Sequence, residues 1–235
     1  MTRFETSACG GLHIELFGAT VTLRGSGAMW LEVERTLVVA DLHFEKGSSY
    51  ASRFGQMLPP YDTRDTLDRL DREITALAPA RLIFLGDSFH DGAGEARLAD
   101  DDAQRLCGLA RGRELVWAVG NHDQDGPRVL PGEVIVEANI LGLTLRHEPE
   151  AGDQPGEVAG HLHPAAKVSS GRGSVRRRCF VTDGSRLILP AFGAYAGGLN
   201  VLDRAFSGLF GGPVLAAALG KQKVHAIGPR SLRPD

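Results

Sequence analysis

The sequence of 235 residues contains no run of 18 or more apolar residues. A helix needs roughly 20 such residues to cross a bilayer, so no transmembrane helix is predicted. The first six residues, Met-Thr-Arg-Phe-Glu-Thr, also lack the apolar core of a signal peptide. We therefore expect a cytoplasmic protein that has no membrane partner.

Cysteine is scarce as well. The three cysteines (Cys9, Cys107 and Cys179) are odd in number and far apart, and they form neither a CxxC pair nor a disulfide ladder. Reduced, structural thiols are the expected state of all three.

The chain has no excess of positive charge, because its formal net charge is −3. This balance argues against a general nucleic-acid binder, but the charge is unevenly distributed. Residues 160–235 carry eleven Lys and Arg against three Asp and Glu, whereas residues 1–159 carry fifteen against twenty-six. Such asymmetry indicates either a polyanionic partner or two oppositely charged faces that pack together.

The first half of the chain alternates between apolar runs and helical periodicity. After short strands within 12–24 and 29–33, the pattern predicts strands over 36–40, 81–85 and 114–119, separated by two helices. The first helix begins at Asp62 or Thr63 and ends before Pro79, and the second covers about 98–110. Residues 47–60 are predicted to form a loop. This alternation is typical of βαβ units and a largely parallel sheet.

From about residue 134 the pattern changes to short β-rich runs, and helical periodicity is scarce. The runs are 134–136, 141–146, 158–161, 179–182, 187–189 and 224–227. They predict a second sheet, largely antiparallel, packed against the first. We expect one α/β domain over residues 1–235, because 43% of the residues are hydrophobic and no linker or repeat is visible.

Metal-ligand residue types follow the predicted strands. The apolar run 38–40 leads into Asp41 and His43, and residues i and i+2 of a strand point to the same side. Four further places carry similar residues: Asp87; Asn121 and His122; His147; and His161 with His163. Each one alone is more often a turn residue or a hydrogen-bonded histidine. Together they supply only oxygen and nitrogen donors, which suit Mn²⁺, Fe or Zn²⁺ at a hydrolytic site.

The same residues resemble a family signature. The blocks Asp41-x-His43, Gly86-Asp87, Gly120-Asn121-His122-Asp123, His147 and Gly160-His161-x-His163 resemble the five blocks of calcineurin-like metallophosphoesterases, over about residues 38–163. Longer phrases are similar to one bacterial branch, the ligase-associated DNA-damage-response endonucleases, over nearly the whole chain. These phrases are ADLHFEKG (40–47), LPPYDT (58–63), LGDSFHD (85–91) and PAFGAY (190–195).

The resemblance implies a sandwich of two β-sheets flanked by helices and a centre of two divalent metal ions, most readily Mn²⁺, with Fe or Zn²⁺ as alternatives. One metal would be held by Asp41, His43, Asp87 and His163, and the other by Asp87, Asn121, His147 and His161. Asp87 would then bridge the two ions. By this resemblance a metal-bound hydroxide attacks phosphorus in line, and His122 protonates the leaving oxygen.

The implied activity is hydrolysis of phosphodiester bonds, with DNA as the substrate, by an endonuclease that works in DNA repair beside a DNA ligase, a helicase and an exonuclease. A phosphomonoesterase or a small-nucleotide phosphodiesterase with the same metals is the alternative enzyme. A non-catalytic scaffold of the same fold is the alternative of another class. Such scaffolds lose ligands or the acid histidine, and this chain keeps all of them.

The sequence leaves the roles of several residues near the predicted site unassigned. His90 stands where the phosphoprotein phosphatase branch of the superfamily places a carboxylate that orients the acid histidine, so Asp91 or Asp123 is expected to orient His122. Candidate phosphate-binding residues are Lys46, Arg53, Arg176 and Arg178. A solvated surface role is the alternative for Lys46 and Arg53, and a solvated face or a salt bridge is the alternative for the two arginines of the 176–178 run. The phrase at 190–195 either forms a wall near the site or meets a requirement for close backbone packing.

Overall fold

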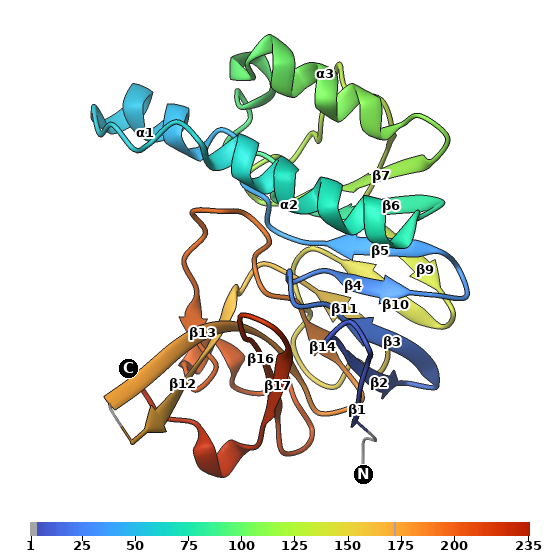
Figure 1. The fold of residues 1–235 in the computed structure, drawn as a ribbon, viewed down its shortest axis with the longest axis vertical. Coiled ribbons are helices and arrows are strands. Elements are labelled where there is room, and N and C mark those ends of the chain that lie inside the picture. The colour runs from blue at the N-terminus through green and yellow to red at the C-terminus, as the bar shows by residue number, and fades with distance from the viewer. Residues whose placement is uncertain (1–3, 172) are drawn as a thin grey trace.

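Two β-sheets pack face to face in the computed structural model, which describes residues 4–171 and 173–235 (Figure 1). Helices α2 (Asp62–Leu77) and α3 (Asp100–Leu109) cover the outer face of the first sheet, and α1 (Lys46–Phe54) projects beyond the end of β5 (Thr36–Val39). Among the described residues, the second sheet carries short 3₁₀ turns alone, Arg204–Phe206 and Pro229–Ser231. The predicted two-sheet α/β fold is therefore confirmed, with the helices on one side of the sandwich.

Over the part of the chain that the structure describes, the first sheet has eight strands in sequence order, and the direction of strand pairing changes at β5. Neighbours from β1 to β5 are antiparallel, whereas β5 to β8 are parallel. The parallel arrangement predicted for the three central strands is confirmed, although the sheet as a whole is mixed. The strands are β1 (Phe4–Thr6), β2 (Leu12–Leu16), β3 (Ala19–Leu23), β4 (Met29–Leu31), β5 (Thr36–Val39), β6 (Arg81–Leu85), β7 (Glu114–Ala118) and β8 (Glu133–Ile135).

The assignment of 134–136 to the second sheet was wrong. β8 pairs in parallel with β7, with Val116 opposite Glu133, so it forms the edge of the first sheet. A short apolar run does not specify which sheet it joins. Here the connection after β7 returns the chain to the same sheet edge.

The second sheet holds the remaining strands. Five of its eight strand pairs in the described chain are antiparallel, which agrees with the prediction of a largely antiparallel sheet. The strands are β9 (Glu137–Ile140), β10 (Leu143–Arg146), β11 (Glu157–Ala159), β12 (Pro164–Ser170), β13 (Gly173–Thr182), β14 (Leu187–Ile188), β15 (Leu199–Asn200), β16 (Leu215–Leu219) and β17 (Val224–Ile227).

The α-helices are α1 (Lys46–Phe54), α2 (Asp62–Leu77) and α3 (Asp100–Leu109). The first was predicted to be a loop, and that prediction was wrong. Its glycine and three serines give it a weak intrinsic helix propensity. Contacts with the start of α2 stabilise it instead, since Gly47 N–H donates to Asp62 Oδ2 (2.8 Å) and Thr63 Oγ1 donates to Glu45 Oε1 (2.9 Å).

No helix in the described residues has both the length and the apolar character that a bilayer crossing requires. The cysteines form no disulfide, and Cys179 is buried whereas Cys9 and Cys107 are exposed.

The central strands of the first sheet are buried on both faces. One face packs on the second sheet, where Val38 and Ile83 belong to the same apolar cluster as Phe180. The other face packs under α2 and α3, where the rings of Phe84 and Trp117 stack with centroids 4.0 Å apart. Burial on both faces explains the continuous apolar runs of β5, β6 and β7. It also fixes the carboxyl ends of these strands at one edge.

Candidate metal centre

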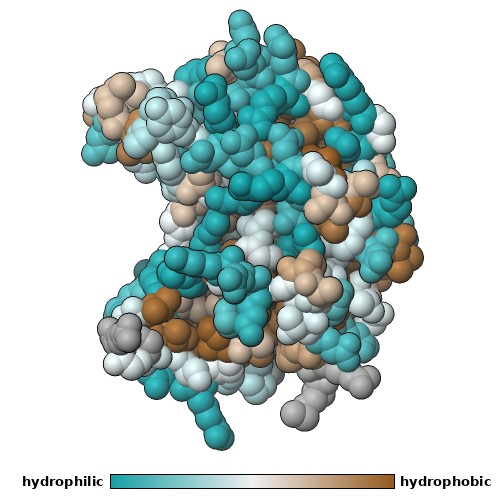
Figure 2. All heavy atoms as spheres, viewed as in Figure 1, coloured by the Kyte–Doolittle hydropathy of each residue, from teal (hydrophilic) through white to brown (hydrophobic). Residues whose placement is uncertain are grey.

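All seven predicted metal ligands gather where the carboxyl ends of the two sheets meet. The first sheet supplies its ligands directly after β5, β6 and β7, and the second sheet supplies the rest around β10, β11 and β12. In Figure 2 the left side of the molecule is hollowed between the part that carries α1 and the part that carries β12 and β13, and β5 in Figure 1 ends toward this hollow.

The ligands form two groups. In the first, His163 Nε2 lies 3.2 Å from Asp41 Oδ1 and 3.2 Å from His43 Nε2. In the second, Asn121 Oδ1 lies 3.0 Å from His147 Nε2 and 2.8 Å from His161 Nδ1. Each group contains three of the four residues that the resemblance assigned to one metal, and the fourth, Asp87, is assigned to both metals.

Asp87 lies between the groups. Its Oδ2 is 3.9 Å from His43 Nε2, whereas its Oδ1 is 3.4 Å from His147 Nε2. Burial alone would raise the pKa of Asp87, but hydrogen bonding with His147 and the charge of that histidine lower it to about 2. A carboxylate that stays ionised and faces two donor groups is what a bridge between two cations requires.

The donor sets fit divalent cations. Ligand atoms bound about 2.1 Å from one ion are roughly 3.0–3.4 Å from each other, which matches the spacing of these side chains. The close approach of His43 Nε2 to His163 Nε2 needs a proton or a cation between the two nitrogens. Burial and the neighbouring His163 lower the pKa of His43 to about 2, so its ring is neutral and its lone pair is available to a metal.

The backbone at the ligands is unusual. Five ligand residues have φ in the left-handed region: Asp41 (54°), His43 (47°), Asp87 (46°), His161 (66°) and His163 (46°). Residues other than glycine seldom adopt this conformation, and it clusters at functional sites. It also corrects the predicted geometry, because β5 ends at Val39 and the Asp41–His43 pair converges through left-handed turns rather than through strand alternation.

The glycines of the motifs make room for the ligands. A Cβ on Gly86 would lie 2.3 Å from the ring of His147, and a Cβ on Gly120 would lie 2.3 Å from Asp87 N and Oδ1. Any side chain at these two positions would displace a ligand. Glycine is therefore required before Asp87 and before Asn121 so that the ligands of the centre can pack.

His122 takes its orientation from the main chain. Its Nδ1 donates to the carbonyl oxygen of His90 (2.8 Å), and its Nε2 lies 3.9 Å from Asp87 Oδ2. The expectation that Asp91 or Asp123 orients His122 was wrong.

Both of those aspartates are engaged elsewhere. Asp91 forms a two-pronged ion pair with Arg97, at 2.9 and 2.8 Å. Asp123 Oδ2 accepts hydrogen bonds from the backbone N–H groups of Ser88 (2.8 Å) and Phe89 (3.1 Å). Burial raises the pKa of Asp123 to about 6, although these two hydrogen bonds act to lower it. Asp123 thus connects the loops that follow β6 and β7.

His90 belongs to the cluster although sequence reasoning treated it only as a departure from a pattern. Its ring stacks on His122 with centroids 5.1 Å apart, and its Nδ1 lies 3.3 Å from His43 Nδ1. Burial and the nearby Lys46 lower the pKa of His90 to about 4, so its ring is neutral near pH 7. Its spacing of three residues after Asp87 is the signal that could have found it.

Helix α1 brings two of the predicted phosphate-binding residues to the rim of the centre. The ring of Tyr50 lies 5.6 Å from that of His90, and Lys46 Nζ lies 5.8 Å from the Tyr50 ring centroid. Arg53 is exposed, with Nη2 3.8 Å from Asp91 Oδ2.

The other two predicted phosphate-binding residues lie on β13 and make contacts within the protein. Arg176 is exposed; it pairs with Asp235 (3.1 Å) and donates to the carbonyl of Gly198 (2.6 Å). Arg178 Nη1 donates to the carbonyls of Ala191 (2.7 Å) and Gly193 (3.2 Å). These hydrogen bonds give Arg178 a structural role in the described chain.

The segment that Arg178 contacts supports the first ligand. Phe192 N–H donates to Ala40 O (2.8 Å) and Gly193 N–H donates to Asp41 O (3.1 Å). A Cβ on Gly193 would lie 2.1 Å from Leu42 O. Of the two explanations for the 190–195 phrase, close backbone packing under Asp41 is the one that these contacts support.

Two hollows open on either side of Asn121. One, of about 380 Å³, reaches His147 and Glu148, and the other, of about 240 Å³, reaches His122 and Glu95. They open the second ligand group and the acid histidine to solvent.

Comparison with known proteins places these residues in a family. A model of calcineurin-like phosphoesterases matches residues 34–185, which include every predicted ligand. Among solved structures, a nuclease from Pseudomonas putida, MPE, matches 96% of this chain and 100% of its own with a TM-score of 0.71 and 29% identity. The E. coli phosphoesterase Yfce matches 82% of this chain and 98% of its own with a TM-score of 0.42 and 16% identity. Comparison with curated proteins gives no match.

Proposed function

Since this chain belongs to the calcineurin-like phosphoesterase family, a class of hydrolases, we propose that it is a two-metal phosphodiesterase that cleaves DNA internally. The observation that carries the proposal is the position of Asp87, whose two oxygens face two separate groups of metal-ligand side chains. One group is Asp41, His43 and His163, and the other is Asn121, His147 and His161. Mn²⁺ is the proposed ion, with Fe or Zn²⁺ as alternatives.

Two divalent ions, when bound, would neutralise charge on the phosphoryl oxygens and lower the pKa of a water molecule. The protein's own side chains supply the remaining functions. His122 is the proposed acid for the leaving oxygen: its Nδ1–H donates to the His90 carbonyl, so the proton it gives up is the second one, on Nε2, which the doubly protonated ring carries. Asn121 offers a neutral oxygen, so that the centre contains fewer negative charges than it would with another carboxylate.

A diester is the proposed substrate rather than a terminal monoester. A dianionic terminal phosphate calls for a cationic clamp beside the metals. Of the nearest candidates, Arg53 already faces Asp91, and Lys46 lies against Tyr50. Both are proposed to contact phosphates that flank the scissile one, and Arg176 is the third proposed phosphate contact.

DNA as the diester is supported by the likeness to the P. putida nuclease and by the endonuclease phrases of the sequence. Those phrases interlock around the centre, since Glu45 of the first binds Thr63 of the second, and Gly193 of the last packs on Leu42. A repair setting beside a ligase, a helicase and an exonuclease is proposed from the sequence resemblance alone. Because one apolar cluster joins both sheets, we also propose that residues 1–235 act as a single domain.

A comparison of substrates and metals tests this function. Purified protein is stripped with a chelator, reloaded with Mn²⁺, Fe²⁺, Zn²⁺ or Mg²⁺, and assayed on bis-p-nitrophenyl phosphate, p-nitrophenyl phosphate and circular single-stranded and duplex DNA. We expect metal-dependent cleavage of the diester and of DNA, with slower turnover of the monoester.

An Asp87→Asn preparation, purified identically, controls for contaminating nucleases. Faster turnover of the monoester than of any diester would replace this proposal with a phosphomonoesterase. Loss of all hydrolysis with the metals retained would favour the scaffold.

A further inference from the structure

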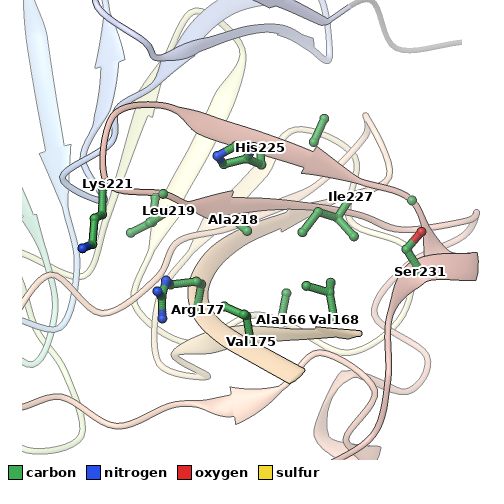
Figure 3. A pocket seen from close by; sticks show the side chains of 13 residues that line it. Ala166, Val168, Val175, Arg177, Ala218, Leu219, Lys221, His225, Ile227 and Ser231 are labelled. Atoms are coloured by element: carbon green, nitrogen blue, oxygen red, sulfur yellow. The ribbon is translucent and has the colours of Figure 1, made fainter. Parts of the chain in front are cut away.

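A groove of about 540 Å³ lies between two β-hairpins of the second sheet, and none of the predicted metal ligands lines it (Figure 3). It exists because β13 changes partner along its length. Gly173–Arg178 pairs with β12, whereas Cys179–Thr182 pairs with β16. Beyond this point the β12–β13 hairpin and the β16–β17 hairpin diverge, and side chains from both face the space between them.

The groove is separate from the candidate metal centre. Side chains alternate along β13, so Val175 and Arg177 face the groove, whereas Arg176 contacts Gly198 and Asp235, and Arg178 contacts the segment that supports Asp41.

The floor and walls of the groove are largely apolar, with the ring of His225 as an exception. Ala166 and Ala218 are buried, and Val168, Val175 and Ile227 are partly exposed to it. In Figure 3 the β12–β13 side chains lie below the groove, and Leu219 and Ile227 lie above it. Figure 2 shows apolar side chains gathered at the lower left, over β12 and β13. A volume of this size is within the range of small-molecule sites, roughly 300–1,000 Å³.

One end of the groove is cationic. Arg177 and Lys221 lie together at that end in Figure 3, with Ser231 at the other. No Asp or Glu is among the described residues that line the groove. Within the described chain, no carboxylate pairs with either cation, and the Arg177 side chain donates only to the carbonyl of its neighbour Arg176. Two neighbouring cations without a counterion favour an anion beside them.

From this combination we infer that the groove binds a small organic anion, whose apolar body packs on the alanines, valines and Ile227 and whose acidic group pairs with Arg177 and Lys221. The acidic group is a carboxylate, sulfonate, sulfate or phosphate, since all accept charge-assisted hydrogen bonds from Arg and Lys. This site is independent of the phosphodiesterase proposal, because no residue of the metal centre lines it.

A matched pair of probes tests the inference. The anion 8-anilinonaphthalene-1-sulfonate and the neutral N-phenyl-1-naphthylamine share an aromatic body and differ in the acidic group. Binding to the full chain is measured by fluorescence titration and located by NMR of labelled methyl groups. We expect the sulfonate to bind roughly tenfold or more tightly than the neutral probe, and to shift the methyl signals of Val168, Val175, Leu219 and Ile227.

The double substitution Arg177→Ala with Lys221→Ala should abolish the preference for the anion while the neutral probe binds as before. Lys223→Ala with Arg204→Ala removes the same charge from exposed positions outside the groove and should leave the preference intact. All four side chains are exposed, and equal melting temperatures establish that the variants are folded. The inference is overturned if the sulfonate shifts only methyl groups elsewhere, or if its affinity survives the loss of Arg177 and Lys221.

Discussion

The Nδ1 atom of His122 lies 2.8 Å from the carbonyl oxygen of His90. A carbonyl oxygen only accepts hydrogen bonds, so Nδ1 carries a proton in the neutral ring and in the doubly protonated ring alike, and the main chain fixes the orientation of the ring. Nε2 is then the nitrogen that faces Asp87 and the centre. A carbonyl partner orients the ring without adding the negative charge that a carboxylate would place beside it.

This relationship predicts how a change at His122 behaves. His122→Asn should retain nearly all bound metal and lose turnover by roughly 10²–10⁴, the usual contribution of a general acid. The loss should shrink for a diester with a good leaving group, which needs no protonation. Metal content by mass spectrometry and rates on two leaving groups measure the effect. Loss of metals from this variant, or an equal loss on both leaving groups, would remove His122 from the role of acid.

Gly86 offers a test of the packing around the second ligand group. Gly86→Ala adds a methyl group 2.3 Å from the ring of His147, in addition to backbone strain at φ +76°. We expect metal loss and a lower melting temperature. Gly142→Ala is the matched control, since its φ of +78° gives similar strain and no atom lies within 4 Å of the added methyl. Equal effects in the two variants would mean that strain alone, and not contact with His147, accounts for the result.

Arg178 should matter for stability. Its guanidinium satisfies carbonyls of the segment that supports Asp41, so Arg178→Ala should lower the free energy of unfolding by about 1–3 kcal/mol. Arg177→Ala, one residue away and exposed, should change it by no more than about 0.5 kcal/mol. Urea denaturation of both variants decides the matter. A stable Arg178→Ala protein with weakened DNA binding would mean that Arg178 contacts the substrate instead.

Asp91 should make the free energy of unfolding depend on pH in the acidic range. Burial alone would raise the pKa of Asp91, but its ion pair with Arg97 holds the pKa well below the usual range. Because the folded pKa lies below the unfolded value of about 3.9, the carboxylate stabilises the fold above that pH, and this contribution is lost as the pH falls below it. Asp91→Asn should be less stable than the natural protein at pH 7, and the difference should narrow toward pH 2. A constant difference across this range would exclude the ionised pair as the cause.

The parts of the fold that sequence reasoning predicted are those with strong local patterns. Strands β5, β6 and β7 are buried on both faces, so each appears as an apolar run that leads directly into a ligand residue. The ligand groups follow from those strand ends. Helix α2 shows the full periodicity of an amphipathic helix.

The parts that were mispredicted depend on contacts distant in sequence. Helix α1 is fixed by Glu45 with Thr63, eighteen residues away, and its own residues favour a helix only weakly. The partner of His122 is a backbone carbonyl, which no side-chain pattern reveals. The groove between the hairpins requires β13 to change partner at Cys179, and a continuous β pattern does not indicate such a change.

The central claim is that DNA is cleaved at a centre of two metal ions bridged by Asp87. The most direct measurement is the rate of DNA cleavage as Mn²⁺ is added back to metal-free protein, with bound metal counted in the same samples. We predict that the rate reaches a plateau at two ions per chain, and that Asp87→Asn binds fewer than two ions and cleaves no DNA above background. Full cleavage by metal-free protein, or an Asp87→Asn variant with two ions and an unchanged rate, would contradict the account.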